Sequence, residues 1–206
     1  TMFTIGWYCL LVAIAGEIIV PFILAPFYNG YRHTTMAIST LGNGSSPVRI
    51  PFRTWMLTAG ILLLLGAMSI YHHYRLVSGA LSGLCWIFIA VFAVGACILS
   101  CFFSVNESKD IVTAASNIHG IGSAVGFMLM LFVPLLIGIL SLKSEQTGTG
   151  ILALCSFVLS LVTFILFIAA DKPSLRNTVI AKEGLWQRMN LVFMYFPLLV
   201  IALQQV

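Results

Sequence analysis

Charged residues are scarce in this sequence, and their scarcity excludes an ordinary soluble domain. Only 8% of the 206 residues are Asp, Glu, Lys or Arg, whereas a soluble globular domain carries about 25%. The net charge of +4 is spread along the chain without a dense basic block. We therefore expect no nucleic-acid partner. This charge supports only a modest attraction to anionic headgroups, and membrane lipids are the partners that we expect.

Long polar segments and alternating apolar patterns are also lacking. Hydrophobic residues make up 60% of the chain, and they gather in continuous runs of about 20 residues, the length that crosses a bilayer as a helix. Continuous runs do not fit the alternation of a membrane barrel. The sequence predicts an all-α polytopic membrane protein, with residues 1–206 forming one bundle of six transmembrane helices. The predicted spans are 5–27, 54–71, 80–103, 118–140, 149–170 and 185–203.

The cysteine pattern gives no sign of a disulfide framework or a cofactor. All five cysteines lie within the predicted spans, and an odd number at that depth favours free thiols packed as small hydrophobic groups. Too few His, Cys, Asp or Glu residues converge to predict a metal site. The first apolar run lacks a basic leader and a cleavage pattern, so we expect it to remain a span.

Glu17 is the one charge inside the first apolar run. A carboxylate at bilayer depth is costly, so it usually faces a protein interior, a polar cavity or a partner. Pro21, four residues later, cannot donate a backbone hydrogen bond to the Glu17 carbonyl. The pair predicts either a polar pocket or a kinked, protonated Glu17 satisfied by a neighbouring helix.

Six spans place both termini on one face of the membrane and three connections on the other. We call the second face the loop face; it carries residues 28–53, 104–117 and 171–184. Eight basic residues lie at this face against two at the terminal face, Arg75 and Lys143. Positive-inside counting therefore favours a cytoplasmic loop face and termini outside. The eight are Arg32, Arg49, Arg53, Lys109, Lys172, Arg176, Lys182 and Arg188.

Polar residues that can serve a binding site also gather at the loop face. Asp110 or Thr113 can cap the fourth span, and the small residues Gly122 and Gly126 predict close helix packing there. Arg188 opens the sixth span, where it can snorkel or hold an anionic group. Our candidate ligand-binding residues are Glu17, His33, Arg53, Ser116, His119 and Arg188.

Three short stretches resemble a known family. They are Ser39-Thr40-Leu41-Gly42, Ser116-Asn117-Ile118-His119-Gly120 and Gly184-Leu185-Trp186-Gln187-Arg188. With them the chain resembles domain-of-unknown-function family 998 (DUF998), six-span membrane proteins of prokaryotes, over nearly its whole length. The resemblance implies a six-span fold in the cell membrane of a prokaryote and a shared polar face. It implies no reaction.

Three classes of function fit these residues. The first is binding or transport of a lipid headgroup or small amphipathic ligand, in a cavity open to the loop face and lined by Glu17, His119 and Arg188. The second is a structural or accessory membrane protein whose polar residues join helices. The third is an intramembrane hydrolase with His119 as base or metal ligand and Glu17 or Asp110 as acid. No nucleophile motif or full metal-ligand set accompanies these residues, so the sequence favours the first class.

Overall fold

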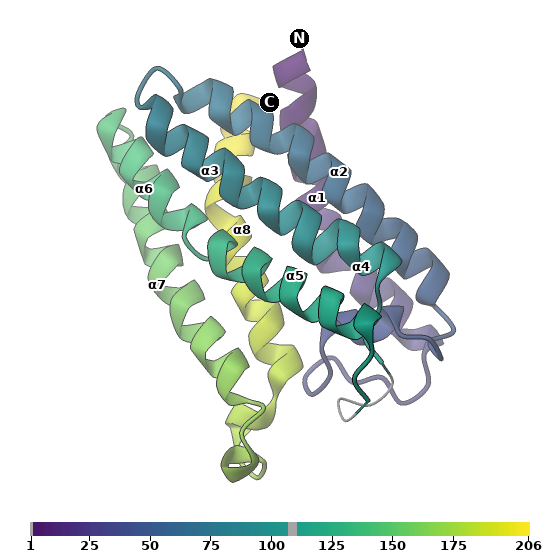
Figure 1. Ribbon diagram of the computed structural model, residues 1–206. Coiled ribbons are helices and arrows are strands. Elements are labelled where there is room, and N and C mark those ends of the chain that lie inside the picture. Colours follow the sequence, from purple (N-terminus) through teal and green to yellow (C-terminus); the bar gives the residue numbers. More distant parts are fainter. Residues whose placement is uncertain (1, 107–110) are drawn as a thin grey trace.

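The computed structural model describes residues 2–106 and 111–206, and within them the chain is helical and without strands. Six helical segments in this part are long and apolar enough to cross a membrane. Both termini lie at one end of the bundle, and the long connections lie at the other (Figure 1). The α-helices are α1 (Met2–Leu24), α2 (Arg49–Tyr74), α3 (Gly79–Phe92), α4 (Leu99–Phe102), α5 (Ala114–Met130), α6 (Val133–Lys143), α7 (Thr147–Ala169) and α8 (Glu183–Gln205).

Short helical turns join or extend these helices. They are η1 (Ala25–Phe27), η2 (Ile38–Gly42), η3 (Ala93–Ile98), η4 (Pro173–Leu175) and η5 (Val179–Ala181). Each of the six predicted spans corresponds to a helical segment, so the predicted fold class is confirmed. The helices extend beyond several predicted limits; α2 begins at Arg49 rather than at residue 54. An apolar run marks the part inside the bilayer, whereas the backbone helix continues into the polar interface.

The fourth span consists of two helices, because a turn at residues 131–132 interrupts the helix between α5 and α6. Pro134 lies in the first turn of α6, where a missing backbone N–H costs little. At its other end, α5 starts with a capping box in which Thr113 and Ser116 each accept from the backbone N–H of the other. The sequence predicted that Thr113 or Asp110 caps this helix. Thr113 is the cap, and Asp110 lies outside the described residues.

The third span contains a π-helical turn, η3, between α3 and α4. Such turns are uncommon and often occur at functional sites. Gly95 in this turn lies against the backbone of Gly122 in α5, and a Cβ atom on Gly122 would be 2.9 Å from the Gly95 carbonyl oxygen. A Cβ atom on Gly126 would be 3.1 Å from Cα of Phe92. The small residues of the fourth span therefore allow close helix contact, as their pattern predicts.

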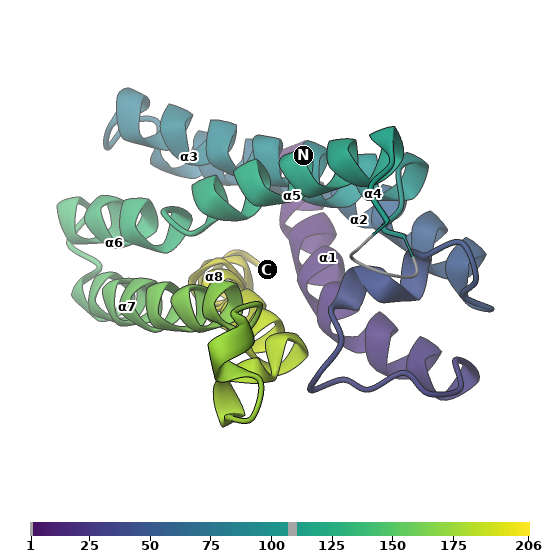
Figure 2. The same cartoon turned by 60° about the horizontal axis from the view of Figure 1, so that its bottom comes forward.

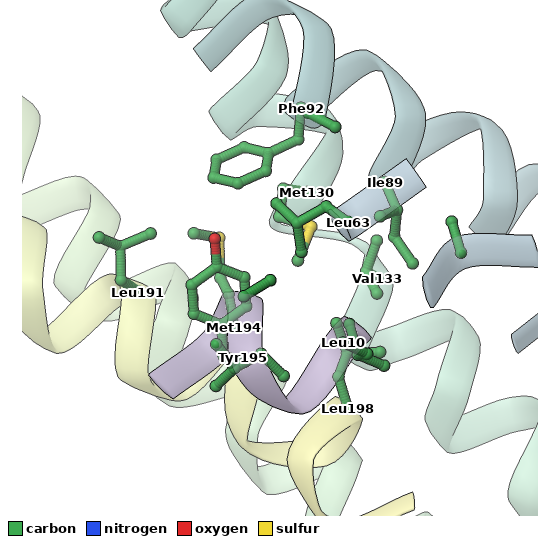
Figure 3. Packing of buried hydrophobic residues seen from close by; sticks show 14 of the residues in the cluster. Leu10, Leu63, Ile89, Phe92, Met130, Val133, Leu191, Met194, Tyr195 and Leu198 are labelled. Carbon is green, nitrogen blue, oxygen red and sulfur yellow. The ribbon is translucent and has the colours of Figure 1, made fainter. Parts of the chain in front are cut away.

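The hydrophobic core fills the middle of the bundle (Figure 3). Leu10 of α1, Leu63 of α2, Ile89 of α3 and Met130 of α5 are each fully buried, and they pack with residues of α6 and α8. The Tyr195 ring of α8 meets the Phe92 ring edge-on, with ring centroids 6.2 Å apart. This packing closes the bundle on the terminal side of the site described below.

Helices α5 and α7 separate toward the loop face. Near the α5–α6 break, the rings of Phe132 and Phe157 lie 5.9 Å apart. Beyond that point the two helices diverge, and α5 continues along α3 and η3 while α7 follows α8 (Figure 2). The divergence leaves room for a cavity between two halves of the bundle.

Candidate functional site

A cavity of about 470 Å³ lies between α1, α2, η3, α5, α7 and the start of α8. It reaches from the loop face, at Ser39 and Asp171, to the depth of Glu17. Phe92 and Leu191, which belong to the core of the bundle, form part of its floor. Its polar and charged lining residues are Glu17, Ser39, Ser100, His119, Ser123, Asp171, Glu183 and Gln187.

Glu17 lies deep in this cavity with only 7% of its surface exposed. Trp55 of α2 donates a hydrogen bond from Nε1 to Glu17 Oε1 across 3.2 Å. The Trp55 ring packs directly on Gly16. This is possible because glycine has no side chain; a Cβ atom at this position would overlap the ring. Pro21 does not end α1, which continues to Leu24. The Glu17 carboxyl is therefore positioned by a continuous helix and by its hydrogen bond to Trp55.

His119 lines the same cavity from α5 and is also 7% exposed. Its Nδ1 is 3.1 Å from the Phe103 carbonyl oxygen and 3.2 Å from Ser100 Oγ. The Ser100 hydroxyl already donates to the Ala96 carbonyl at 2.5 Å. A carbonyl can only accept, so this network assigns the proton to Nδ1. In the neutral ring Nε2 is then a hydrogen-bond acceptor.

Arg188 does not line the cavity of His119, which corrects the expectation of one cavity shared by Glu17, His119 and Arg188. Arg188 lines a second cavity of about 360 Å³ between α1 and α8, and Glu17 lies on both. Its Nη1 donates to the carbonyls of His33 at 2.6 Å, Gly184 at 2.9 Å and Met36 at 3.3 Å. Its Nη2 donates to the Tyr31 hydroxyl at 2.6 Å. The guanidinium therefore holds the first connection against α8.

The other three sequence candidates do not line either cavity. His33 stacks on Phe22 with ring centroids 4.5 Å apart. Burial and the Arg188 guanidinium lower the pKa of His33 from its ordinary 6.5. Arg53 donates from Nε to the Gly42 carbonyl at 3.1 Å. Ser116 forms the capping box of α5. Local hydrogen bonds occupy Arg53 and Ser116, so neither side chain turns inward.

Sequence reasoning missed three residues that shape the site: Trp55, Ser100 and Gln187. Gln187 lines the cavity, and its Oε1 accepts from the Ile38 backbone N–H at 2.7 Å, which fixes η2 over the loop-face end. Gln187 belongs to one of the three motifs that carry the family resemblance, so the sequence offered a signal for it. Nothing in the sequence pairs Trp55 with Glu17 or Ser100 with His119, because these contacts depend on how the helices pack.

The lining residues permit hydrogen bonding and charge pairing. Among the described residues, no group of three or more His, Cys, Asp or Glu lies close enough together to hold a metal ion. Asp110, the alternative acid for hydrolysis, and Lys109 of the charge count lie outside the described residues. The five cysteines are free, and they range from buried at Cys85 and Cys97 to exposed at Cys155.

The fold and the cavity define an integral membrane protein whose described residues form six helical segments able to span a membrane, with a partly polar internal site. The sequence pattern of the family described as "Protein of unknown function (DUF998)" matches residues 11–204. The chain belongs to this family, as the three motifs indicated. No curated protein and no solved structure matches the chain.

Proposed function

We propose that this protein binds, and by binding moves, a small amphipathic molecule in the cavity between α5 and α7. The observation that supports the proposal best is that Glu17 of α1 and His119 of α5, each nine-tenths buried, line one cavity. Burying a polar group is costly unless it is hydrogen-bonded, and among the residues that the structure describes, protein partners form hydrogen bonds only with Oε1 of Glu17 and Nδ1 of His119. A hydrogen-bonding ligand would satisfy the second polar atom of each side chain.

The size and lining of the cavity support an amphipathic occupant. Its volume of about 470 Å³ falls within the range of about 300–1,000 Å³ of small-molecule sites. Apolar residues such as Met56, Phe127 and Phe164 make up most of the wall, and the eight polar or charged residues named above make up the rest. An apolar body with one polar end fits this distribution.

The cavity also reaches the membrane-facing surface of the chain. Its lining includes Gly120, Ala124 and Met128 on α5 and Ile168 on α7, and all four are exposed. These residues lie within spanning helices. A molecule dissolved in the bilayer can therefore enter between α5 and α7, while Ser39 and Asp171 mark a route to the loop face.

A second candidate, a structural or accessory protein without a ligand, is favoured by one observation. Arg188 directs Nη1 and Nη2 entirely to groups of the protein itself, and so does Trp55 with its indole N–H. These contacts join elements far apart in the sequence. They explain Arg188 and Trp55 but leave the cavity beside His119 without a role.

The test is to fill the cavity from a position that tolerates a side chain. A Cβ atom on Gly120 meets nothing within 4 Å, and Gly120 lines the cavity. Gly120→Leu should therefore occupy the cavity without displacing a helix. Gly83→Leu is the matched control, because Gly83 has equal room and lines neither cavity. Small molecules retained through purification from membranes are measured by mass spectrometry of the wild type and both variants.

We expect the wild type and Gly83→Leu to retain the same organic molecule, and Gly120→Leu to lose it. Equal retention in all three proteins would place the molecule elsewhere. The wild type is also purified in a second detergent. If it retains no molecule in either detergent, the result contradicts the proposal and favours the structural alternative.

A further inference from the structure

We propose that the polar end of the ligand is an organic cation. This inference rests on the proposed function and names the chemical class of the ligand. It replaces the expectation from the sequence that Arg188 holds an anionic group of the ligand, because Arg188 does not line the cavity of Glu17 and His119.

The charged side chains of the cavity are acidic. Glu17, Asp171 and Glu183 line it, and no Lys or Arg does so within the described part of the chain. Glu17 matters most, because it lies deepest and is nine-tenths buried. Trp55 Nε1 supplies a neutral donor to one carboxyl oxygen rather than a compensating charge. A buried carboxylate is stabilised by an opposite charge at close range, and a cationic ligand would supply that charge.

The aromatic lining favours the same sign of charge. Five phenylalanine rings from four elements line the cavity: Phe52, Phe92, Phe127, Phe164 and Phe167. The face of an aromatic ring attracts a cation within about 6 Å, and more strongly where water is excluded. An anion would face the same rings without that attraction.

His119 is compatible with a cation and can orient it through a hydrogen bond. Its Nδ1 proton points to the Phe103 carbonyl, which leaves Nε2 of the neutral ring as an acceptor. An ammonium N–H can donate to such a nitrogen. The described residues offer no cluster for a metal ion, so carboxylate and aromatic groups together fit an amine or quaternary cation on an apolar body.

Two probes of equal shape and opposite charge test the inference directly. Tetraphenylphosphonium and tetraphenylborate share four phenyl groups and differ in sign. Binding of each to the purified protein is measured by equilibrium dialysis, corrected for uptake by protein-free micelles. We expect the wild type to bind the phosphonium about tenfold or more tightly than the borate, a ratio that corresponds to one favourable charge contact.

Glu17→Gln isolates the charge, because glutamine keeps an oxygen that can accept from Trp55. We expect the phosphonium affinity of Glu17→Gln to fall about tenfold and the borate affinity to stay equal or rise. Glu145→Gln makes the same change in an exposed turn outside the cavity and should alter neither affinity. The wild-type comparison stands even if Glu17→Gln fails to fold.

The two proposals fail differently. Equal or tighter binding of borate by the wild type, with retained molecules still lost in Gly120→Leu, overturns the cation inference alone. Unchanged phosphonium binding in Gly120→Leu would place that ion outside the cavity, and it overturns the cation inference as well. Unchanged retention of the molecule from membranes in Gly120→Leu overturns the proposed function.

Discussion

Trp55 Nε1 of α2 donates to Glu17 Oε1 of α1 across 3.2 Å, at the point where the two cavities meet. The contact crosses 38 residues of sequence. It joins the first two spans and fixes the one carboxyl group that both cavities share. A carboxyl at this depth would otherwise carry the full cost of burial without a donor.

Trp55→Phe removes this donor and keeps an aromatic ring over Gly16. We expect it to lower the free energy of unfolding by about 1–3 kcal/mol, because a buried acceptor loses its partner. Thermal unfolding in detergent measures the change. Trp86→Phe is the control, since the buried Trp86 Nε1 has no hydrogen-bond partner among the described residues. Equal losses in the two variants would show that the ring, and not the hydrogen bond, matters.

Two buried tyrosines should respond oppositely to the same substitution. The Tyr74 hydroxyl shares a 2.8 Å hydrogen bond with Ser141 Oγ. The Tyr195 hydroxyl is buried and has no partner within the described ranges. Tyr74→Phe should cost about 1 kcal/mol or more, whereas Tyr195→Phe should be neutral or stabilising. Both residues are at most 1% exposed, so a difference in burial cannot explain opposite results in thermal unfolding. A clear loss in Tyr195→Phe would reveal a partner for its hydroxyl.

Arg188→Lys keeps the positive charge but removes the planar guanidinium group and its several N–H donors. Lysine cannot reach three carbonyls and the Tyr31 hydroxyl together, so the first connection should loosen from α8. Each hydrogen bond to a charged group contributes roughly 1.5–3 kcal/mol, and we expect a loss of at least that size. Limited proteolysis of the connection and thermal unfolding both measure it. Arg75→Lys, at an exposed site on the terminal face, should change neither. Wild-type stability in Arg188→Lys would contradict the holding role.

The fold was largely predictable from the sequence, and the site only in part. Continuous apolar runs predict spanning helices because the bilayer requires internally bonded backbone. The depth of Glu17 and the position of His119 also identified two true lining residues. Arg188 was placed in the wrong cavity, since the sequence cannot show that carbonyls of the first connection surround it. The same holds for Ser116, whose hydroxyl closes a cap three residues back.

His33 should make stability depend on pH. Its ring stacks on Phe22, meets the Tyr31 ring edge-on and lies close enough to the Arg188 guanidinium to experience its charge. Burial and that guanidinium hold the pKa of His33 below 6.5 in the folded protein. The unfolded chain therefore binds the proton first as pH falls, and the folded state loses stability from about pH 7 downward. Thermal unfolding of the wild type and His33→Gln across about pH 5.5–7.5 should show a smaller decline in the variant. Parallel curves would exclude His33 as a source of the decline.

The most direct test of the binding account is a density map of the wild-type protein in lipid nanodiscs at a resolution that shows side chains. We predict non-protein density between Glu17 and His119, with an apolar part extending toward the gap between α5 and α7. A cavity closed by its own phenylalanine rings, with Glu17 and His119 bonded only to protein, would contradict it.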